Sequence, residues 1–281
     1  MSPNASTIAS GGMPRRRRHT VSDVAVLTRR NLRHTVRLPE VLATSAIMPT
    51  VFILMFTYVF GGAVGASLPP AAAGRYVNWL VPGLLAQFAL FGGAATASGL
   101  VEDLDKGVID RFRSLPMARS AVLAARTVSD LLRSVLTLTL MLTVGAAIGF
   151  RVQTDLLGLL GGVGVALLFS YAWSWAMAVV ALTVRTAEAV QAAVYMGVFP
   201  LAFTSSVFVP IQTMPGWLQP FAANQPITVV TNALRGLVLG PGALPPGQAV
   251  TGQVLLALGW SLAIGAVFAP LAVRAYRRTV R

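Results

Sequence analysis

The chain has 281 residues, of which 55% are hydrophobic and only 11% charged, and its mean hydropathy is +0.71. A typical soluble domain carries about 25% charged residues, so this composition excludes an ordinary water-soluble domain and predicts a membrane protein. The chain contains no cysteine, which excludes disulfides, thiol catalysis and cysteine-ligated zinc. Its two histidines, His19 and His34, precede the first apolar stretch, so we expect no histidine-ligated metal inside the membrane.

The chain begins with a polar segment that we interpret as a disordered basic tail. Residues 1–20 are rich in Ser and Gly and contain the run Arg15–Arg18, a composition that favours disorder. Residues 21–38 place apolar side chains among basic ones, which favours an amphipathic helix on the membrane surface. We expect residues 21–281 to form a single transmembrane domain.

Six later stretches are apolar enough to cross a bilayer, which requires about 20 such residues. The predicted fold is therefore all-α, with six transmembrane helices. Prolines at 49, 82 and 200 fall inside these stretches and should bend the helices. The expected spans cover residues 41–60, 79–100, 121–149, 156–184, 190–210 and 251–273.

The longest loop on the predicted inner side gathers charge. Four of the nine acidic residues and the only lysine, Lys106, fall within residues 102–110. On a helix over residues 101–115, apolar residues share one face and charged residues the other, which is typical of an amphipathic surface helix. Pro116 would end this helix. A solvated connecting loop is the alternative.

Three charges at the start of the third span, Arg126, Asp130 and Arg133, are spaced at i, i+4 and i+7 and share a helix face. Charges this close to the membrane are usually paired. We predict that they form a brace at the cytoplasmic mouth. A site that admits an anionic head group is the alternative.

The connection between the fifth and sixth spans, residues 211–247, is unusually apolar for an external loop. Pro226 suits a first helical turn and Gly240 a helix end. We expect two short helices that dip into the outer leaflet, with an ordinary structured loop as the alternative. Trp79 is expected to anchor the second span at the outer interface.

The basic residues are divided unevenly between the two sides of the predicted membrane domain. Of the 22 Lys and Arg residues, only Arg75, Arg151 and Arg235 fall on the side opposite the termini. Positive charge stays on the cytoplasmic side, so both termini are expected inside, in a multi-pass protein of the cell membrane. The net charge of +13 then requires no nucleic-acid partner.

The motifs of ATP hydrolysis and of other catalysis are missing from the sequence. A P-loop requires G-x-x-x-x-G-K-[ST], whereas the single lysine stands in DLDKGVI. An ion-coupled transporter usually carries acidic groups near the bilayer centre, but here the acids fall at or near the span ends. We therefore expect a chain that is not an enzyme and binds no cofactor or metal itself.

Two segments resemble a known family. The stretch EDLDKGVIDRFRSLPMARS is similar to the cytoplasmic signature of type-2 ATP-binding-cassette (ABC) exporter permeases. The stretch FAANQPITVVTNALRGLVLG, residues 221–240, is similar to an external segment of the daunorubicin-resistance permease branch. The resemblance covers essentially residues 20–281.

This resemblance implies a bacterial permease subunit that pairs with a second copy or a homologue and binds a cytoplasmic ATPase holding ATP and Mg. Hydrophobic or amphipathic compounds, drug-like or lipid, would leave the cytoplasm or inner leaflet. An ion-gradient-driven transporter and a non-transporting membrane scaffold are the alternatives. The coupling element 102–116 would contact the ATPase through Glu102, Asp103, Lys106, Gly107, Asp110, Arg111, Arg113, Ser114, Leu115 and Pro116.

Aromatic residues on the first, second and fifth spans are candidates for lining the path of such a substrate. Ordinary packing is the alternative for each of them, because aromatic side chains at helical spacing usually belong to a core. The candidates are Phe52, Phe56, Phe88, Phe91, Tyr195, Phe199 and Phe203.

Overall fold

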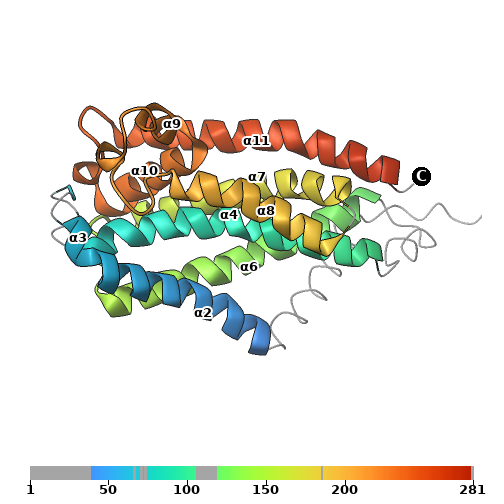
Figure 1. Cartoon of the computed structure of the whole chain (residues 1–281), viewed down its shortest axis with the longest axis horizontal. Coiled ribbons are helices and arrows are strands. Elements are labelled where there is room, and N and C mark those ends of the chain that lie inside the picture. Colours follow the sequence, from blue (N-terminus) through green and yellow to red (C-terminus); the bar gives the residue numbers. More distant parts are fainter. Residues whose placement is uncertain are drawn as a thin grey trace, which may run out of the picture.

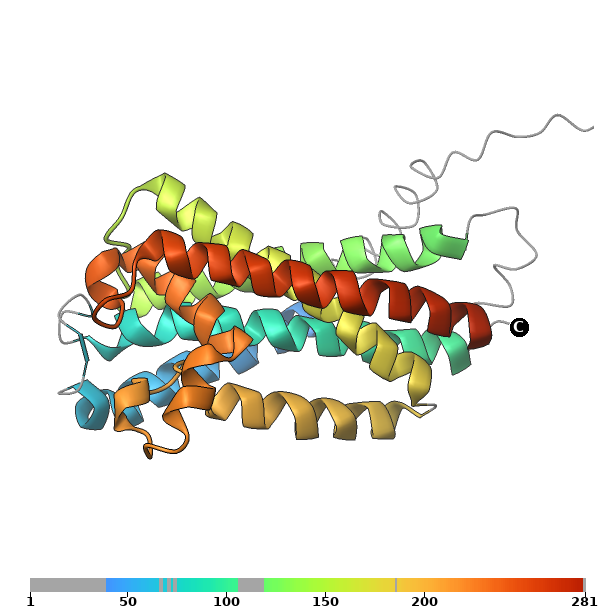
Figure 2. The same cartoon turned by 90° about the horizontal axis from the view of Figure 1, so that it is seen from above.

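The computed structural model of the protein describes residues 39–279, apart from 66–67, 70–71, 73–74, 106–118 and 185. Within these residues the chain is helical, without a strand, and forms an elongated bundle (Figures 1 and 2). The predicted all-α class is confirmed. The predicted tail and surface helix before residue 39 lie outside the described residues.

Five helical stretches among the described residues are long and apolar enough to cross a membrane. In the first, α2 (Pro39–Met55) continues through the π-helix η1 (Phe56–Phe60) into α3 (Gly61–Gly65). The other four are α4 (Tyr76–Asp105), α6 (Arg119–Ile148), α7 (Leu156–Thr183) and α11 (Val250–Thr279). The shorter helices are α8 (Ala187–Phe203), α9 (Gln219–Asn224) and α10 (Pro226–Leu239).

Helix α4 is the centre of the bundle and packs against α6, α7, α8 and α10. Of its apolar window 62% is buried, against 17% for α11 and 11% for the stretch that begins in α2. Glycine allows the close packing, since an added Cβ at Gly93 would lie 2.8 Å from the ring of Trp173 in α7. The peripheral helices expose large apolar side chains instead, as surfaces in contact with lipid do.

The two ends of the bundle differ (Figure 1). The end of α4, the start of α6 and the end of α11 lie together (Figures 1 and 2), and we call this the terminal end. The opposite end carries α9 and α10 together with the short 3-10 turns η3 (Ile211–Thr213) and η4 (Pro241–Ala243). We call it the loop end.

Two predicted boundaries were wrong. The fifth span was expected over residues 190–210, but the helix ends at Phe203. Residues 204–209 turn, and the carbonyl groups of 206–208 accept hydrogen bonds from side chains of other elements. The start expected for the surface helix at residue 101 is not a helix boundary, and residues 106–115 of that prediction lie outside the described residues. Helix α4 continues through Asp105, because no Gly or Pro interrupts the backbone ladder between Leu100 and that residue.

The two short helices expected between residues 211 and 247 are present as α9 and α10. Pro226 occupies the first turn of α10, and Gly240 ends it with a φ of +87°, a value that favours glycine. Helix α10 is more enclosed than a loop helix would be, since 12 of its 14 residues are buried. It packs against α4, α7 and α11 and so belongs to the core of the loop end.

Candidate functional site

The predicted ATPase-coupling residues begin within the central helix, α4. Glu102 and Asp103 belong to the last turn of α4, at the terminal end of the bundle. Their side chains, and all of the residues from Lys106 to Pro116, lie outside the part of the chain that the structure describes. The element therefore starts as a direct extension of α4, and its contact with an ATPase stays a prediction.

Seven phenylalanines from α2, η1, α4, α8 and the turn after α8 form a closed circuit of ring contacts, which we call the aromatic circuit. Neighbouring ring centroids lie 4.4–6.1 Å apart, separations typical of stacked and edge-to-face pairs. Tyr195 joins it through Phe199 at 5.3 Å, and Phe60 through Phe56 at 5.1 Å. In order, the circuit is Phe56, Phe52, Phe88, Phe91, Phe199, Phe203 and Phe208, which closes on Phe56.

All seven predicted path residues belong to this circuit or to its Tyr195 branch, so the structure brings them together. Phe208 was not among the predicted path residues, and its ring stacks on both Phe56 and Phe203. It lies five residues after Phe203, a spacing that does not share a helical face, and only the turn brings the two rings together. Phe203 and Tyr195 are about half exposed, at 50% and 53%, so the circuit presents rings at the surface of the bundle.

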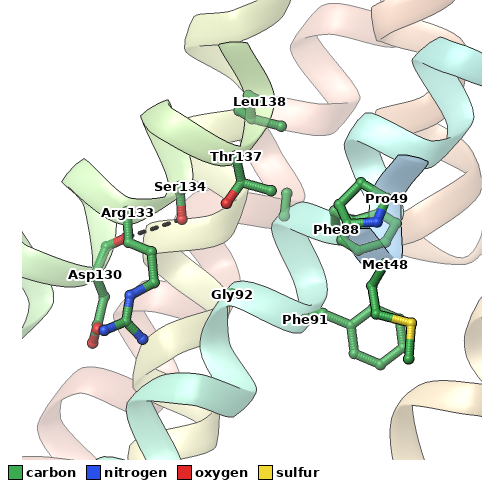
Figure 3. A pocket seen from close by; sticks show the side chains of 11 residues that line it. Met48, Pro49, Phe88, Phe91, Gly92, Asp130, Arg133, Ser134, Thr137 and Leu138 are labelled. Carbon is green, nitrogen blue, oxygen red and sulfur yellow. Dashed lines mark hydrogen bonds between the residues drawn. The ribbon is translucent and has the colours of Figure 1, made fainter. Parts of the chain in front are cut away.

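A cavity of about 190 Å³ lies beside the circuit, between α2, α4 and α6 (Figure 3). Phe88 and Phe91 of α4 belong to both the circuit and the cavity wall. Figure 3 shows apolar side chains from α2 and α4 facing polar ones from α6. The lining residues are Met48, Pro49, Phe88, Ala89, Phe91, Gly92, Asp130, Arg133, Ser134, Thr137 and Leu138.

The polar wall of the cavity is one stripe of α6, with Asp130, Arg133, Ser134 and Thr137 at helical spacing. Ser134 Oγ donates to the carbonyl oxygen of Asp130 at 3.0 Å and lies 3.0 Å from Ser170 Oγ of α7. The Nε of Arg133 is buried and has no hydrogen-bond partner among the described residues. The side chain of Arg126 lies outside the described part, so the predicted three-residue brace stays a prediction.

A second arginine, Arg235 of α10, is completely buried at the loop end. Its Nη2 donates to the carbonyl oxygens of Ser206, Val207 and Trp79 at 2.7, 3.1 and 3.1 Å, and its Nε donates to Trp79 O at 3.2 Å. Its Nη1 donates to Ser206 Oγ at 3.1 Å, and its Cζ lies 3.4 Å over the centroid of Trp79. We call these four residues the arginine node.

Burial lowers the pKa of the Arg235 guanidinium, because the charged form loses its hydration. Arginine nevertheless stays protonated in proteins. Charge-assisted hydrogen bonds are stronger than neutral ones, and a cation over an indole face is attracted by the ring quadrupole. Protein contacts in the arginine node therefore replace the water that this cation has lost.

The arginine node satisfies the turn after α8, whose carbonyl groups are not used in a helix. Backbone groups at membrane depth need protein partners, because lipid offers none. Arg235 binds two successive carbonyls, those of Ser206 and Val207, and the Tyr76 hydroxyl donates to the next one, Phe208 O, at 2.8 Å. This explains why the fifth predicted span can stop early without exposing unpaired backbone.

The same turn packs closely against α4 and α10. A Cβ added to Gly83 of α4 would lie 2.7 Å from Val207 O, so only glycine allows this approach. Thr228 Oγ1 of α10 accepts from Ser206 N at 3.1 Å. Helix α4, the turn and α10 thus form one packed unit at the loop end.

The prediction that Trp79 anchors the outer interface was wrong, because this residue is only 3% exposed and lies beneath Arg235. For Arg235 the sequence predicted only a basic residue on the side opposite the termini. A sequence signal existed, since Arg235 is the only charged residue in 211–247 and follows Thr228, Thr231 and Asn232 by seven, four and three positions. That spacing marks a polar stripe on an otherwise apolar helix.

These features together favour non-covalent binding of amphipathic molecules. The aromatic circuit offers ring faces and edges, and the neighbouring cavity adds polar groups on one side. Within the described residues, no group of three or more His, Asp and Glu side chains is placed to hold a metal ion.

Comparison with known sequences relates the chain to membrane permeases. A family model described as ABC-2 type transporter matches residues 22–239. The chain is 35% identical over 239 residues to a daunorubicin resistance ABC transporter permease protein, DrrB1, of Streptomyces coeruleorubidus, which covers 85% of this chain and 80% of the relative. It is 28% identical over 233 residues to a probable doxorubicin resistance ABC transporter permease protein, DrrC, of Mycobacterium tuberculosis, covering 83% and 80%.

Proposed function

This chain belongs to the ABC-2 type transporter family, and we propose that it exports amphipathic, drug-like compounds using ATP hydrolysis in a separate cytoplasmic subunit. The resemblance found in the sequence is thereby confirmed, and the chain is a bacterial membrane permease. Relatives named for daunorubicin and doxorubicin resistance support the substrate class. The absence of a P-loop from the whole sequence supports an ATPase in a partner.

The aromatic circuit is the observation that carries the substrate proposal. Flat, partly aromatic molecules gain dispersion and quadrupole interactions by stacking on phenylalanine rings. The half-exposed rings of Phe203 and Tyr195 make one edge of the circuit accessible from outside the bundle. A drug-like compound that has partitioned into the bilayer would therefore meet rings before it meets polar groups.

We further propose that α8 is the fifth of six membrane spans and that the terminal end is cytoplasmic. At a rise of 1.5 Å per residue, the 17 residues of α8 extend about 25 Å, slightly less than the hydrocarbon thickness of about 30 Å. The turn after Phe203, protected by Arg235 and Tyr76, covers the remaining distance. The ATPase would then meet the coupling element 102–116, and a second permease copy or homologue would cover exposed apolar faces.

Helix α4 would transmit the action of the ATPase. It runs without interruption from Trp79 in the arginine node, past Phe88 and Phe91 of the aromatic circuit, to Glu102 at the start of the coupling element. It is also the most buried of the long helices. A displacement imposed at its end would therefore reach both sites through one rigid element.

The substrate proposal is tested by ATP-dependent uptake of daunorubicin into inverted membrane vesicles that contain the permease and its ATPase. Phe199→Leu keeps apolar volume but removes a ring that contacts Phe91, Tyr195 and Phe203. We expect uptake to fall severalfold. The matched control is Trp260→Leu, because Trp260 is an exposed aromatic residue on α11 and is not part of the circuit. Equal uptake by both variants would contradict a substrate role for the rings.

The coupling proposal is tested by purifying the Glu102→Lys, Asp110→Lys double variant and measuring the ATPase activity that accompanies it. We expect the ATPase to co-purify with the unchanged chain and to be lost from the variant. Uptake driven by a proton gradient without ATP would instead favour an ion-coupled transporter. A bound ATPase without substrate movement would favour a scaffold.

A further inference from the structure

We propose that the cavity between α2, α4 and α6 binds the phosphate head group of a membrane phospholipid and that the Arg133 guanidinium contacts this phosphate. This site differs from the aromatic circuit in chemistry, although Phe88 and Phe91 line both. The inference goes beyond the export function and does not depend on which compound is exported, because it concerns a lipid held by the resting permease.

The polarity of the cavity changes along α6 in the way that a phospholipid does. Asp130 and Arg133 lie one turn apart on α6 (Arg119–Ile148), at the end of the polar wall nearer the start of that helix. Ser134 and Thr137 come next, and Leu138 lies about 12 Å along the axis from Asp130 at 1.5 Å per residue. The charged groups of the cavity wall thus lie toward the start of α6, and its apolar side chain lies toward the end of the helix.

The size of the cavity excludes a whole drug-sized ligand. Its volume is about 190 Å³, below the roughly 300–1,000 Å³ of pockets that enclose such molecules. It suffices for a head-group phosphate and the first carbons attached to it. The chains would continue along α2, where Met48 and Val51 are 60% and 46% exposed.

The guanidinium of Arg133 is the group in this cavity best suited to a phosphate. Its Nε is buried without a hydrogen-bond partner among the described residues, and an unsatisfied charged donor at membrane depth is unfavourable. A guanidinium binds phosphate oxygens through two parallel N–H bonds. The hydroxyl of Thr137, on the same wall, can supply a further donor. Asp130 restricts the phosphate to the Arg133 side, because two anions repel each other.

The proposal is tested on the full chain purified with its ATPase and depleted of lipid. Dioleoylphosphatidylglycerol is titrated in, and the bound molecules are counted by native mass spectrometry. We expect one tightly bound lipid per permease. Arg133→Gln should weaken lipid binding by about tenfold or more, which is the effect of losing a charge-assisted hydrogen bond. Arg274→Gln removes the same charge from an exposed site on α11 and should bind like the unchanged chain.

Two further ligands distinguish the source of the phosphate. Dioleoylglycerol, which lacks a phosphate, should bind at least tenfold more weakly than the phospholipid. Inorganic phosphate at millimolar concentration should not displace the lipid, because it makes no apolar contacts. Displacement by inorganic phosphate, or equal binding of dioleoylglycerol, would overturn the assignment to a lipid phosphate.

Two further variants keep the test decisive if Arg133→Gln does not fold. Thr137→Phe fills the cavity while leaving Arg133 in place and should also lose the tightly bound lipid. Asp130→Asn should retain it. If Thr137→Phe still binds the lipid tightly, the cavity does not hold the phosphate. If Asp130→Asn loses the lipid while Arg133→Gln keeps it, the cavity selects a cation.

Discussion

Arg235 at the loop end and Arg133 beside the cavity are the same residue type in two different situations. Every nitrogen of the Arg235 guanidinium donates to a protein oxygen, and the group is fully buried. Arg133 lies on a cavity wall, and its Nε has no partner among the described residues. The number of hydrogen-bond partners, and not the depth in the bundle, therefore distinguishes an arginine that stabilises the fold from one that is available to a ligand.

The difference follows from the backbone around each arginine. Helix α6 is continuous around Arg133, so its carbonyls are already used within the helix and offer the guanidinium little. Around Arg235 the chain has left helical geometry at residues 204–209 and presents free carbonyls. A broken helix thus gives a buried arginine its acceptors, and an unbroken one leaves it for other molecules.

The largest expected effect comes from removing the buried arginine. Arg235→Ala leaves the carbonyls of Ser206 and Val207 without their donor, and each unsatisfied buried acceptor costs about 1–3 kcal/mol. We expect the free energy of unfolding to fall by about 4 kcal/mol, measured by thermal and denaturant unfolding in detergent. Arg151→Ala is the control, because Arg151 is exposed. If Arg235→Ala and Arg151→Ala lose equal free energy of unfolding, Arg235 does not hold the fold.

A smaller effect is expected from crowding the turn that Arg235 holds. Gly83→Ala places a Cβ 2.7 Å from Val207 O, and overpacking of this kind costs about 1–3 kcal/mol. The same unfolding measurement should show this loss. Gly259→Ala on α11 meets no atom within 4 Å and should not destabilise the protein. If Gly83→Ala has the same free energy of unfolding as Gly259→Ala, the close approach between the turn and α4 is not required for stability.

The third effect concerns a single neutral hydrogen bond. Tyr76→Phe removes the donor to Phe208 O while keeping the ring, and a hydrogen bond of this kind contributes about 1 kcal/mol. We expect a loss of that size in unfolding free energy. Tyr171→Phe, at an exposed tyrosine of α7, should change nothing measurable. A loss as large as that of Arg235→Ala would mean that Tyr76 is the main support of the turn.

The smallest effect is expected at the cavity. Arg133→Gln, unfolded in lipid-free detergent, should change the free energy of unfolding by no more than about 0.5 kcal/mol, as for substitutions away from structural contacts. Added phosphatidylglycerol should stabilise the unchanged chain more than this variant, because a ligand stabilises only the state that binds it. A loss of several kcal/mol without lipid would show that Arg133, like Arg235, holds the fold.

Much of the fold could be predicted from the sequence, because long apolar stretches leave few arrangements in a membrane. The expected spans near 79–100, 156–184 and 251–273 correspond to α4, α7 and α11. The end of α8 at Phe203 could not be predicted in the same way. Hydropathy continues through Val209, and the turn is stable only because Arg235, 29 positions beyond Ser206, reaches its carbonyls.

The candidate sites were predictable to different degrees. The seven aromatic candidates were chosen for type and position, and tertiary packing then joined them through Phe208. Asp130 and Arg133 were recognised by their spacing, but the cavity depends on Met48 of α2 approaching α6, which no local pattern contains. Trp79 was misplaced because an indole at the end of an apolar stretch looks the same whether lipid or an arginine covers it.

The contact between Arg235 and Trp79 has an optical consequence. An excited indole shifts electron density across its two rings, so a fixed positive charge 3.4 Å from the ring centroid alters the wavelength and yield of its fluorescence. Trp79 is one of five tryptophans, and Trp217 contrasts with it at 80% exposure. A chain that retains Trp79 as its sole tryptophan would therefore report without a label whether the loop end opens during a transport cycle.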